Sequence, residues 1–168
     1  MIAAVAACSK PAPAPAASDT CDDLKGPPRA KCLDEKFPIT HQAISWDTVD
    51  VLDGKITAKV PRGWTKSATG FEYTDPALGG VYALRTIPIA EIPAAAPPRT
   101  HVIKDQRPPN GRVLIWEKLE QYVKTIDISV YRWVEGSPTA YACTAKLPRQ
   151  LTLNEPDFEA ACSAFAPK

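Results

Sequence analysis

Apolar and polar residues alternate along much of this chain, most clearly over residues 123–134. There, Ile126, Ile128, Val130 and Val134 share one side of an extended backbone. The opposite side carries Thr125, Asp127, Ser129, Tyr131 and Trp133. Successive side chains of a β-strand point to opposite faces, so the alternation predicts a strand in a sheet with one buried face and one face that is partly open.

Shorter segments of the same kind predict a sheet of many strands. The expected strands are residues 46–52, 55–60, 71–75, 81–89, 112–119 and 139–146, with a short strand at 101–104. Asp53-Gly54 lies between the first two expected strands. The pair favours a two-residue hairpin turn, because both positions of such a turn need positive φ and Asp-Gly is a preferred pair there. One face of the segment 81–89 is expected to carry Val81, Ala83, Ile87 and Ile89.

Residues 154–165 carry the signals of a helix instead. Asn154 is a candidate N-cap and Pro156 suits the first turn. The residues at helical spacing that would form its apolar face are Phe158, Ala161, Cys162 and Phe165. We therefore predict an α+β fold, in which a twisted antiparallel β-sheet packs against one or two helices and is stabilised by disulfides. Residues 20–168 are expected to form a single globular domain.

Composition narrows the range of partners. The chain has 168 residues with 20 basic and 19 acidic side chains, and a net charge of +1 does not indicate nucleic-acid binding. No apolar run in the sequence is long enough for a transmembrane helix. The 18 prolines fall mostly between apolar runs, which favours strands and loops over long helices.

The chain has five cysteines, at positions 8, 21, 32, 143 and 162. With Cys8 set aside, four remain, and four cysteines permit three disulfide connectivities. We favour the local pairing, Cys21–Cys32 and Cys143–Cys162. No C-x-x-C pair occurs and the histidines stand apart from the cysteines, so neither a zinc site nor any other metal or cofactor is expected. Disulfides persist in the periplasm and are rare in the cytosol.

The segment Val5-Ala6-Ala7-Cys8 resembles a bacterial lipobox. The resemblance implies a diacylglycerol on the sulfur of Cys8, residues 1–7 as the remnant of a signal peptide, and residues 8–19 as a lipidated cysteine with a Pro/Ala-rich tether. Ser9, rather than aspartate, follows Cys8, which favours an anchor in the outer membrane. Only seven residues precede Cys8 and none is basic. Either the start lies upstream, or the match is accidental.

A second resemblance covers about a quarter of the chain. The segment Ile56-Thr-Ala-Lys-Val-Pro-Arg-Gly-Trp64, followed by Phe71-Glu-Tyr-Thr-Asp-Pro76, is similar to the opening of PsbP-like and DcrB-like domains. This resemblance implies an antiparallel sheet packed with helices, and several bacterial members are envelope lipoproteins. The family has no common catalytic site, so it assigns no functional residue here.

Candidate catalytic residues do not form a recognisable motif. His41 and His101 lie in expected loops, and neither a Gly-x-Ser-x-Gly nor a Ser-x-x-Lys sequence occurs. Asp47, Asp50 and Asp53 are three residues apart, which does not match a calcium loop. We therefore expect a protein that is not an enzyme.

Binding is the stronger prediction. Basic side chains gather in the proline-rich segment 94–112, and large aromatic side chains follow on the next two strands. The predicted partner-binding residues are Arg99, His101, Lys104, Arg107, Arg112, Trp116, Tyr131 and Trp133. Tryptophan, tyrosine and arginine are enriched at the energetic centres of interfaces. The alternative is that the tryptophans belong to the core and that the basic loop is merely solvated.

The size, lipobox, tether and cysteines together resemble the immunity lipoproteins that are paired with toxins of bacterial secretion systems. That resemblance implies a periplasmic protein partner, such as a secreted toxic hydrolase, with membrane contact through the lipid anchor only and no nucleic acid. The alternative function is an accessory or ligand-carrying envelope lipoprotein with a structural role.

Overall fold

The computed structural model describes residue 21, residues 23–120 and residues 123–167. The predicted signal-peptide remnant at 1–7, the lipidation of Cys8 and the tether at 8–19 lie outside the described residues. Among the described residues, no helix is both long and apolar enough to cross a membrane.

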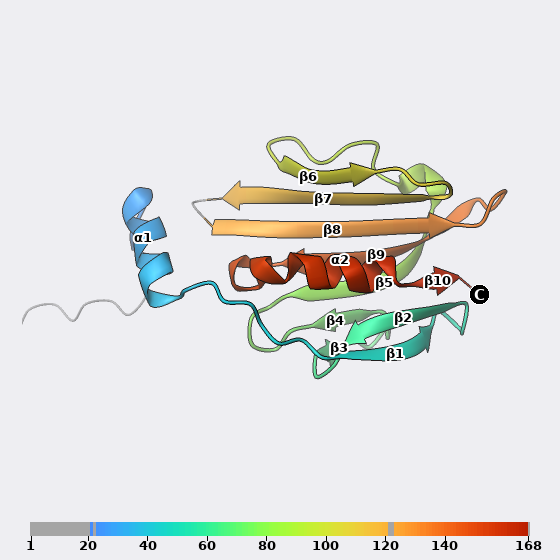
Figure 1. The fold of residues 1–168 in the computed structure, drawn as a ribbon, viewed down its shortest axis with the longest axis horizontal. Coiled ribbons are helices and arrows are strands. Elements are labelled where there is room, and N and C mark those ends of the chain that lie inside the picture. Colours follow the sequence, from blue (N-terminus) through green and yellow to red (C-terminus); the bar gives the residue numbers. More distant parts are fainter. Residues whose placement is uncertain (1–20, 22, 121–122, 168) are drawn as a thin grey trace, which may run out of the picture.

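A seven-stranded antiparallel sheet forms the centre of the fold, with strand order β3-β4-β5-β9-β8-β7-β6 (Figure 1). Its strands are β3 (Thr65–Lys66), β4 (Glu72–Thr74), β5 (Val81–Pro88), β6 (His101–Gln106), β7 (Gly111–Glu120), β8 (Val123–Trp133) and β9 (Thr139–Leu147). The predicted strands in this part of the chain are therefore present. Their register is regular except for a bulge between Val102 and Lys104.

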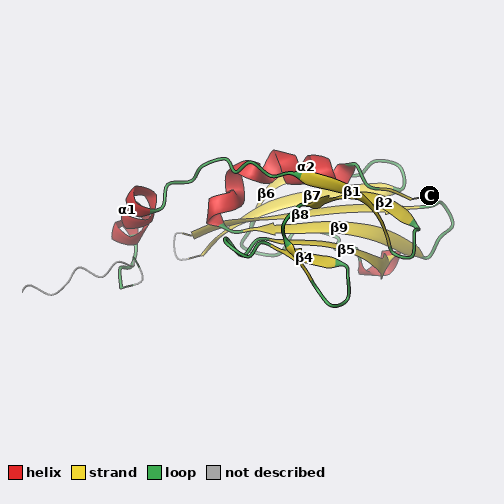
Figure 2. Ribbon diagram, turned by 90° about the horizontal axis from the view of Figure 1, so that it is seen from below, coloured by secondary structure: helices red, strands yellow, loops and turns green. Residues whose placement is uncertain are grey.

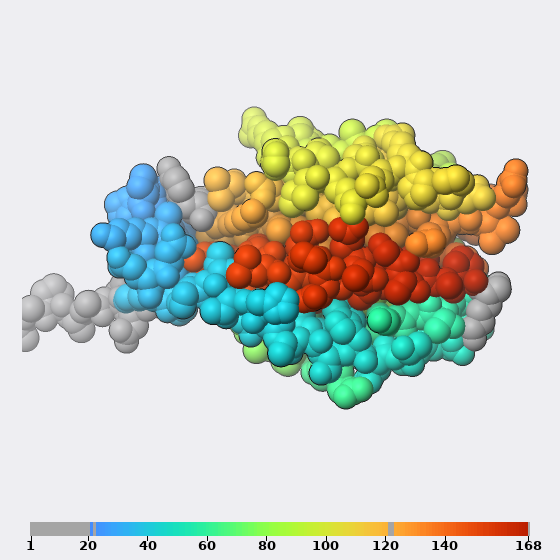
Figure 3. Space-filling view, in the orientation of Figure 1, coloured from blue at the N-terminus to red at the C-terminus, as the bar shows by residue number. Residues whose placement is uncertain are grey.

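A smaller sheet and a helix cover one face of the large sheet (Figures 1 and 2). The small sheet has the order β1-β2-β10, formed by β1 (Trp46–Val51), β2 (Ile56–Pro61) and β10 (Ala166–Pro167). The helix α2 (Glu155–Ser163) follows the 3-10 helix η2 (Arg149–Asn154) and contacts β8, β9 and β2. On the surface seen in Figure 3, α2 lies between β6 and β7 on one side and β1 and β2 on the other.

The core lies between the large sheet and this covering layer. The large sheet contributes Ile128 and Val130 from β8, as the alternation predicts. The helix contributes Phe158, Cys162 and the following Phe165, each at most 1% exposed. The predicted apolar face of the helix is therefore the face that packs on the sheet.

Asn154 stands at the N-cap position of α2, but its side chain makes no capping hydrogen bond. Instead, its Oδ1 accepts from the backbone N–H of Gln42 at 3.0 Å, and its Nδ2 donates to the carbonyl of Gln42 at 2.7 Å and to Asp157 at 3.0 Å. Asn154 is fully buried. Its side chain therefore ties the segment before β1 to the start of α2.

Two local predictions are corrected by the structure. The hairpin between β1 and β2 has a four-residue connection rather than a two-residue turn, since Val51 pairs with Ile56 and positive φ extends over Leu52, Asp53 and Gly54. In β5, the fully buried residues are Tyr82 and Leu84, and the face that carries Val81 and Ala83 points away from the core. The hydroxyl of Tyr82 donates to the carbonyl of Lys59 in β2 at 2.7 Å, which lets this polar side chain enter the core.

The chain crosses the outer face of the large sheet between β5 and β6. These two strands are separated by β9, β8 and β7. The crossover comprises the 3-10 helix η1 (Ile89–Glu91) and the loop to residue 100, and the carbonyl of Ala94 accepts hydrogen bonds from Arg107 at 2.9 Å and Arg112 at 3.2 Å. The face that the sequence predicted to be partly open is therefore partly covered by the chain itself.

The helix α1 (Pro27–Lys36) lies beyond one end of the sheets and buries none of its residues (Figure 1). Arg149, whose side chain is 6% exposed, connects it to the domain by donating to Asp34 and to the carbonyl of Phe37. The disulfide Cys21–Cys32 closes α1 onto the chain before it, and Cys143–Cys162 joins β9 to α2. The local pairing of the four cysteines that was favoured from the sequence is therefore confirmed.

Candidate functional site

The predicted partner-binding residues lie on β6, β7, β8 and the loops on either side of β6, but they do not form one surface. Lys104 faces the helix side of the sheet, where its amino group donates to Glu159 of α2. The next residue, Asp105, faces the outer side and binds Arg112. The sheet therefore separates the basic residues that the sequence grouped together.

Arg112 and Tyr131 are corrected as contact residues, because they are only 4% and 3% exposed. The Nε and Nη2 of Arg112 donate to the two carboxylate oxygens of Asp105 at 2.9 and 3.0 Å. These hydrogen bonds hold the pKa of Asp105 below its usual value. Arg112 thus holds the crossover and β6 against β7, which is a structural role that the sequence did not indicate.

Arg99, His101 and Arg107 remain exposed at the edge of the sheet. Arg99 has a left-handed backbone with φ of 63°. The Nδ1 of His101 lies 3.5 Å from a carboxylate oxygen of Glu117. These three residues are accessible to a partner.

Trp116 and Trp133 are half-buried on the outer face, each beside a part of the crossover. Trp133 lines a hollow of about 350 Å³ with Ile89, Ile92 and Pro93, here called the Trp133 hollow. Trp116 lines a second hollow of about 270 Å³ beneath Pro97 and Pro98. Neither tryptophan belongs to the core cluster between the two layers, and each lines a hollow on the outer face. Their role in binding a partner stays a prediction.

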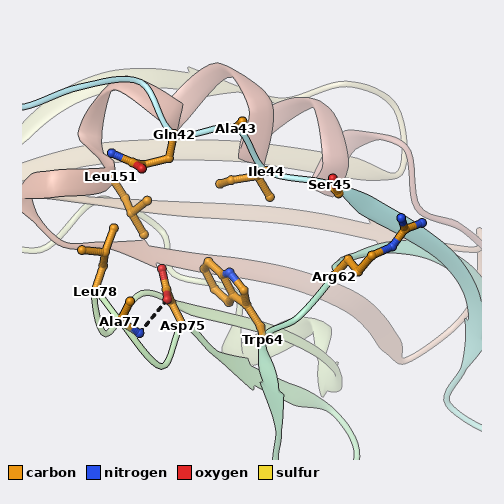
Figure 4. A pocket seen from close by; sticks show the side chains of 10 residues that line it. All are labelled: Gln42, Ala43, Ile44, Ser45, Arg62, Trp64, Asp75, Ala77, Leu78 and Leu151. Carbon is orange, nitrogen blue, oxygen red and sulfur yellow. Dashed lines mark hydrogen bonds between the residues drawn. The ribbon is translucent and has the colours of Figure 1, made fainter.

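A third hollow, which the sequence analysis missed, lies near the covering layer (Figure 4). It has a volume of about 330 Å³ and is named the Trp64 hollow after the residue in its wall. Its other main lining residues are Ile44, Arg62, Asp75, Leu78 and Leu151. They come from the segment before β1, the turn that follows β2, the turn between β4 and β5, and η2.

The wall of the Trp64 hollow is mostly apolar, since Ile44, Trp64, Leu78 and Leu151 project toward its middle (Figure 4). Asp75 points into the same space, and its Oδ1 accepts the backbone N–H of Ala77 at 2.9 Å. This arrangement combines an aromatic ring, aliphatic walls and one carboxylate in an open depression.

Arg62 lies at the far end of the hollow, and its side chain forms an ion pair with Asp47. Its Nε and Nη2 donate to the Oδ1 of Asp47 at 2.9 and 2.6 Å. The hydrogen bonds from Arg62 lower the pKa of Asp47 below its ordinary value. The positive charge of Arg62 is therefore balanced on the side of β1.

Local backbone geometry brings Trp64 and Asp75 to this place. Gly63, with φ of 81°, turns the chain out of β2 and so positions Trp64. After Asp75, a tight turn returns the chain to β5, with the N–H of Asp75 donating to the carbonyl of Gly80 at 2.8 Å. The sequence signal that could have found the site is the Pro-Arg-Gly-Trp run ending at Trp64, but Ile44 and Leu151 join it only in the folded chain.

Gly80 lies against the wall of the hollow, where a side chain has no room. A Cβ at this position would lie 2.6 Å from Cδ1 of Leu151 and 2.9 Å from Cη2 of Trp64. We expect Gly80→Ala to lower the free energy of unfolding by about 1–3 kcal/mol, because overpacking forces neighbours from their rotamers. Urea denaturation measures the change. The cost should fall in a Leu151→Ala background, and an equal cost in both backgrounds would contradict the steric explanation.

The remaining acidic residues add no metal site in the described part of the chain. Among the described residues, no group of three or more histidine, cysteine or carboxylate side chains could hold a metal ion. Burial raises the pKa of Asp127 beside Lys146, and burial also raises the pKa of Glu155 at the start of α2. Asp127 lines the hollow beside Trp116, while Glu155 lies on the helix side of the sheet.

Comparison with known proteins gives a likeness in structure alone. No family model matches the sequence, and no curated protein matches it. A mutant of the protein Mog1 superposes with a TM-score of 0.54 at 8% identity, covering 73% of this chain and 96% of that chain. The Saccharomyces cerevisiae Ran-binding protein Mog1p gives a TM-score of 0.47 at 10% identity, covering 70% of this chain and 84% of that chain. The first of these shows that the chain is similar to Mog1 in overall fold.

Proposed function

We propose that this chain is a non-enzymatic envelope lipoprotein whose folded domain faces the periplasm and binds another protein. The partner is a secreted antibacterial effector, such as a toxic hydrolase, which the chain inhibits as an immunity protein. The observation that carries the binding proposal is the open Trp64 hollow, whose volume of about 330 Å³ suits a side chain of a partner. Tryptophan commonly dominates the binding energy of protein interfaces when it lines such a depression.

The disulfides support the proposed compartment. Both bridges close within the domain, and structural disulfides form and persist in oxidising compartments such as the periplasm. The lipobox-like segment before Cys8 and the Pro/Ala-rich residues after it support an anchor followed by a tether. We place that anchor in the outer membrane because serine, not aspartate, follows Cys8.

Lipidation of Cys8 is tested by labelling with palmitate in a bacterial host. We expect the wild-type chain, expressed with its signal peptide, to incorporate label and to fractionate with membranes, and Cys8→Ala to lose both properties. A double substitution, Cys21→Ala with Cys32→Ala, is the control, because it removes the two disulfide-bonded cysteines that follow Cys8 in the sequence and keeps the lipid acceptor. Equal labelling of wild type and Cys8→Ala would refute the anchor.

Partner binding is tested by site-specific photo-crosslinking in cells. A photoreactive residue at Ala77, on the exposed rim of the Trp64 hollow, is expected to form an adduct with a secreted hydrolase. The control position is Leu119, which is 67% exposed at the end of β7. The captured hydrolase should lose activity when one equivalent of the purified domain is added. A hydrolase that keeps full activity, or adducts that are equally abundant at both positions, would contradict the proposal.

The second candidate function, a ligand-carrying envelope lipoprotein, is favoured by one observation. The Trp133 hollow has a mostly apolar wall and a volume of about 350 Å³, which lies within the range of small-molecule sites. A carrier should retain a ligand through purification, so mass spectrometry of organic extracts from the native protein distinguishes the two functions.

A further inference from the structure

We propose that the Trp64 hollow binds an arginine side chain of the partner protein. This inference rests on the proposed function and adds the chemistry by which the partner is recognised. It has three grounds: the charge of Asp75, the accessible ring of Trp64, and the shape of the space between them.

The first ground is an unbalanced carboxylate. One oxygen of Asp75 accepts the N–H of Ala77, and within the described ranges no lysine, arginine or histidine forms an ion pair with Asp75. Arg62, the cation in the lining of this hollow, is paired with Asp47. The hollow therefore carries one net negative charge, which favours a cation and repels an acidic side chain.

The second ground is an aromatic ring that no cation covers. Trp64 packs against Phe158 with a centroid distance of 5.5 Å and an interplanar angle of 43°, so the core holds its orientation. The one cation–π contact within the part of the chain that the structure describes is Arg132 over Phe165. The part of the Trp64 indole that faces the hollow is thus available, and tryptophan is the strongest of the aromatic cation–π partners.

The third ground is the geometry that these two groups share. In Figure 4, the Asp75 carboxylate and the Trp64 ring lie next to one another, with Leu78 and Leu151 beside them. A planar guanidinium can stack on an indole and donate to a carboxylate at the same time, whereas an ammonium acts as a point charge. The aliphatic stem of an arginine would contact the leucines.

The inference is tested with the folded domain and a defined probe, the blocked amino acid Nα-acetyl-arginine methylamide. Its binding is followed by the NMR shift of the Trp64 indole N–H, which Trp64→Phe assigns. We expect saturable binding to wild type, weaker binding of the lysine analogue, and no binding of the glutamate analogue. The citrulline analogue, which has the shape of arginine without its charge, should bind about threefold to tenfold more weakly.

Two matched variants test whether the charge of Asp75 is responsible for the binding of the arginine probe. Asp75→Asn keeps an oxygen that can accept the N–H of Ala77 and removes only the charge, and it should weaken the arginine probe by about threefold to tenfold. Asp53→Asn, in the connection between β1 and β2, should leave the affinity unchanged. Equal affinities for the arginine and citrulline probes, or an unchanged affinity in Asp75→Asn, would overturn the inference.

The same variant separates this inference from the proposed function. If Asp75→Asn inhibits the captured hydrolase as well as wild type does, the arginine site is wrong and the immunity function stands. If the wild-type domain inhibits no hydrolase but binds the arginine probe through Asp75, the proposed function is wrong and the site stands.

Discussion

Replacement of Phe158 by alanine is expected to lower the free energy of unfolding by about 3–5 kcal/mol, because it removes a large buried ring and leaves a cavity. Phe158 is fully buried at the centre of the covering layer. Its ring centroid lies 5.2 Å from that of Trp46, 5.5 Å from that of Trp64 and 6.2 Å from that of Tyr82. These contacts join α2 to β1, to the turn between β2 and β3, and to β5, so the loss affects both sheets.

Chemical denaturation monitored by circular dichroism gives the free energy of unfolding for wild type and variant. Phe37→Ala is the matched control, since Phe37 is 43% exposed beyond the end of α1 and its truncation should change stability by less than about 0.5 kcal/mol. A loss below about 1 kcal/mol in Phe158→Ala would mean that the aromatic cluster does not hold the layers together.

Replacement of both Cys143 and Cys162 by alanine should lower the free energy of unfolding by about 2–4 kcal/mol. The bridge spans 19 residues of sequence and joins β9 to α2, and both cysteines are fully buried. Without it, the unfolded chain gains conformational freedom, and the packing of α2 on the sheet depends on side-chain contacts alone. Thermal and urea denaturation under oxidising conditions measure the change.

The control for that experiment is the other bridge. Replacement of Cys21 and Cys32 by alanine should cost less than about 1 kcal/mol of domain stability, because α1 buries no residue and its order is only loosely linked to the core. If the two double variants lost the same stability, the view of α1 as an appendage would be incorrect.

Strand positions were the part of the fold that the sequence predicted best, because the alternation in β8 follows directly from one face packing on a core. The orientation of β5 could not be predicted in the same way. The hydroxyl of Tyr82 makes the residue an uncertain core candidate from the sequence. In the structure, the side chain is buried because this hydroxyl donates to the carbonyl of Lys59 in the other sheet. Such a partner is known only once the two sheets are placed together.

The candidate site was less predictable, for a related reason. Whether Arg112 contacts solvent depends on where the crossover lies, and the carbonyl of Ala94 with the carboxylate of Asp105 enclose its guanidinium. The Trp64 hollow brings together Ile44 and Leu151, which are far apart in the sequence. Periodicity reports the faces of single elements, and it carries no information on a depression formed between several of them.

The placement of α2 and β10 has a consequence for the order in which the parts of the domain can fold. Both elements come later in the chain than every strand of the large sheet. Even so, β10 pairs with β2 to complete the small sheet, and Asn154 of η2 binds Gln42 in the segment before β1. The apolar residues of β2 and β8 therefore stay uncovered until the segment that ends at residue 167 has joined them. Such a chain cannot complete its fold stepwise from the amino end, because its last elements close both the small sheet and the core.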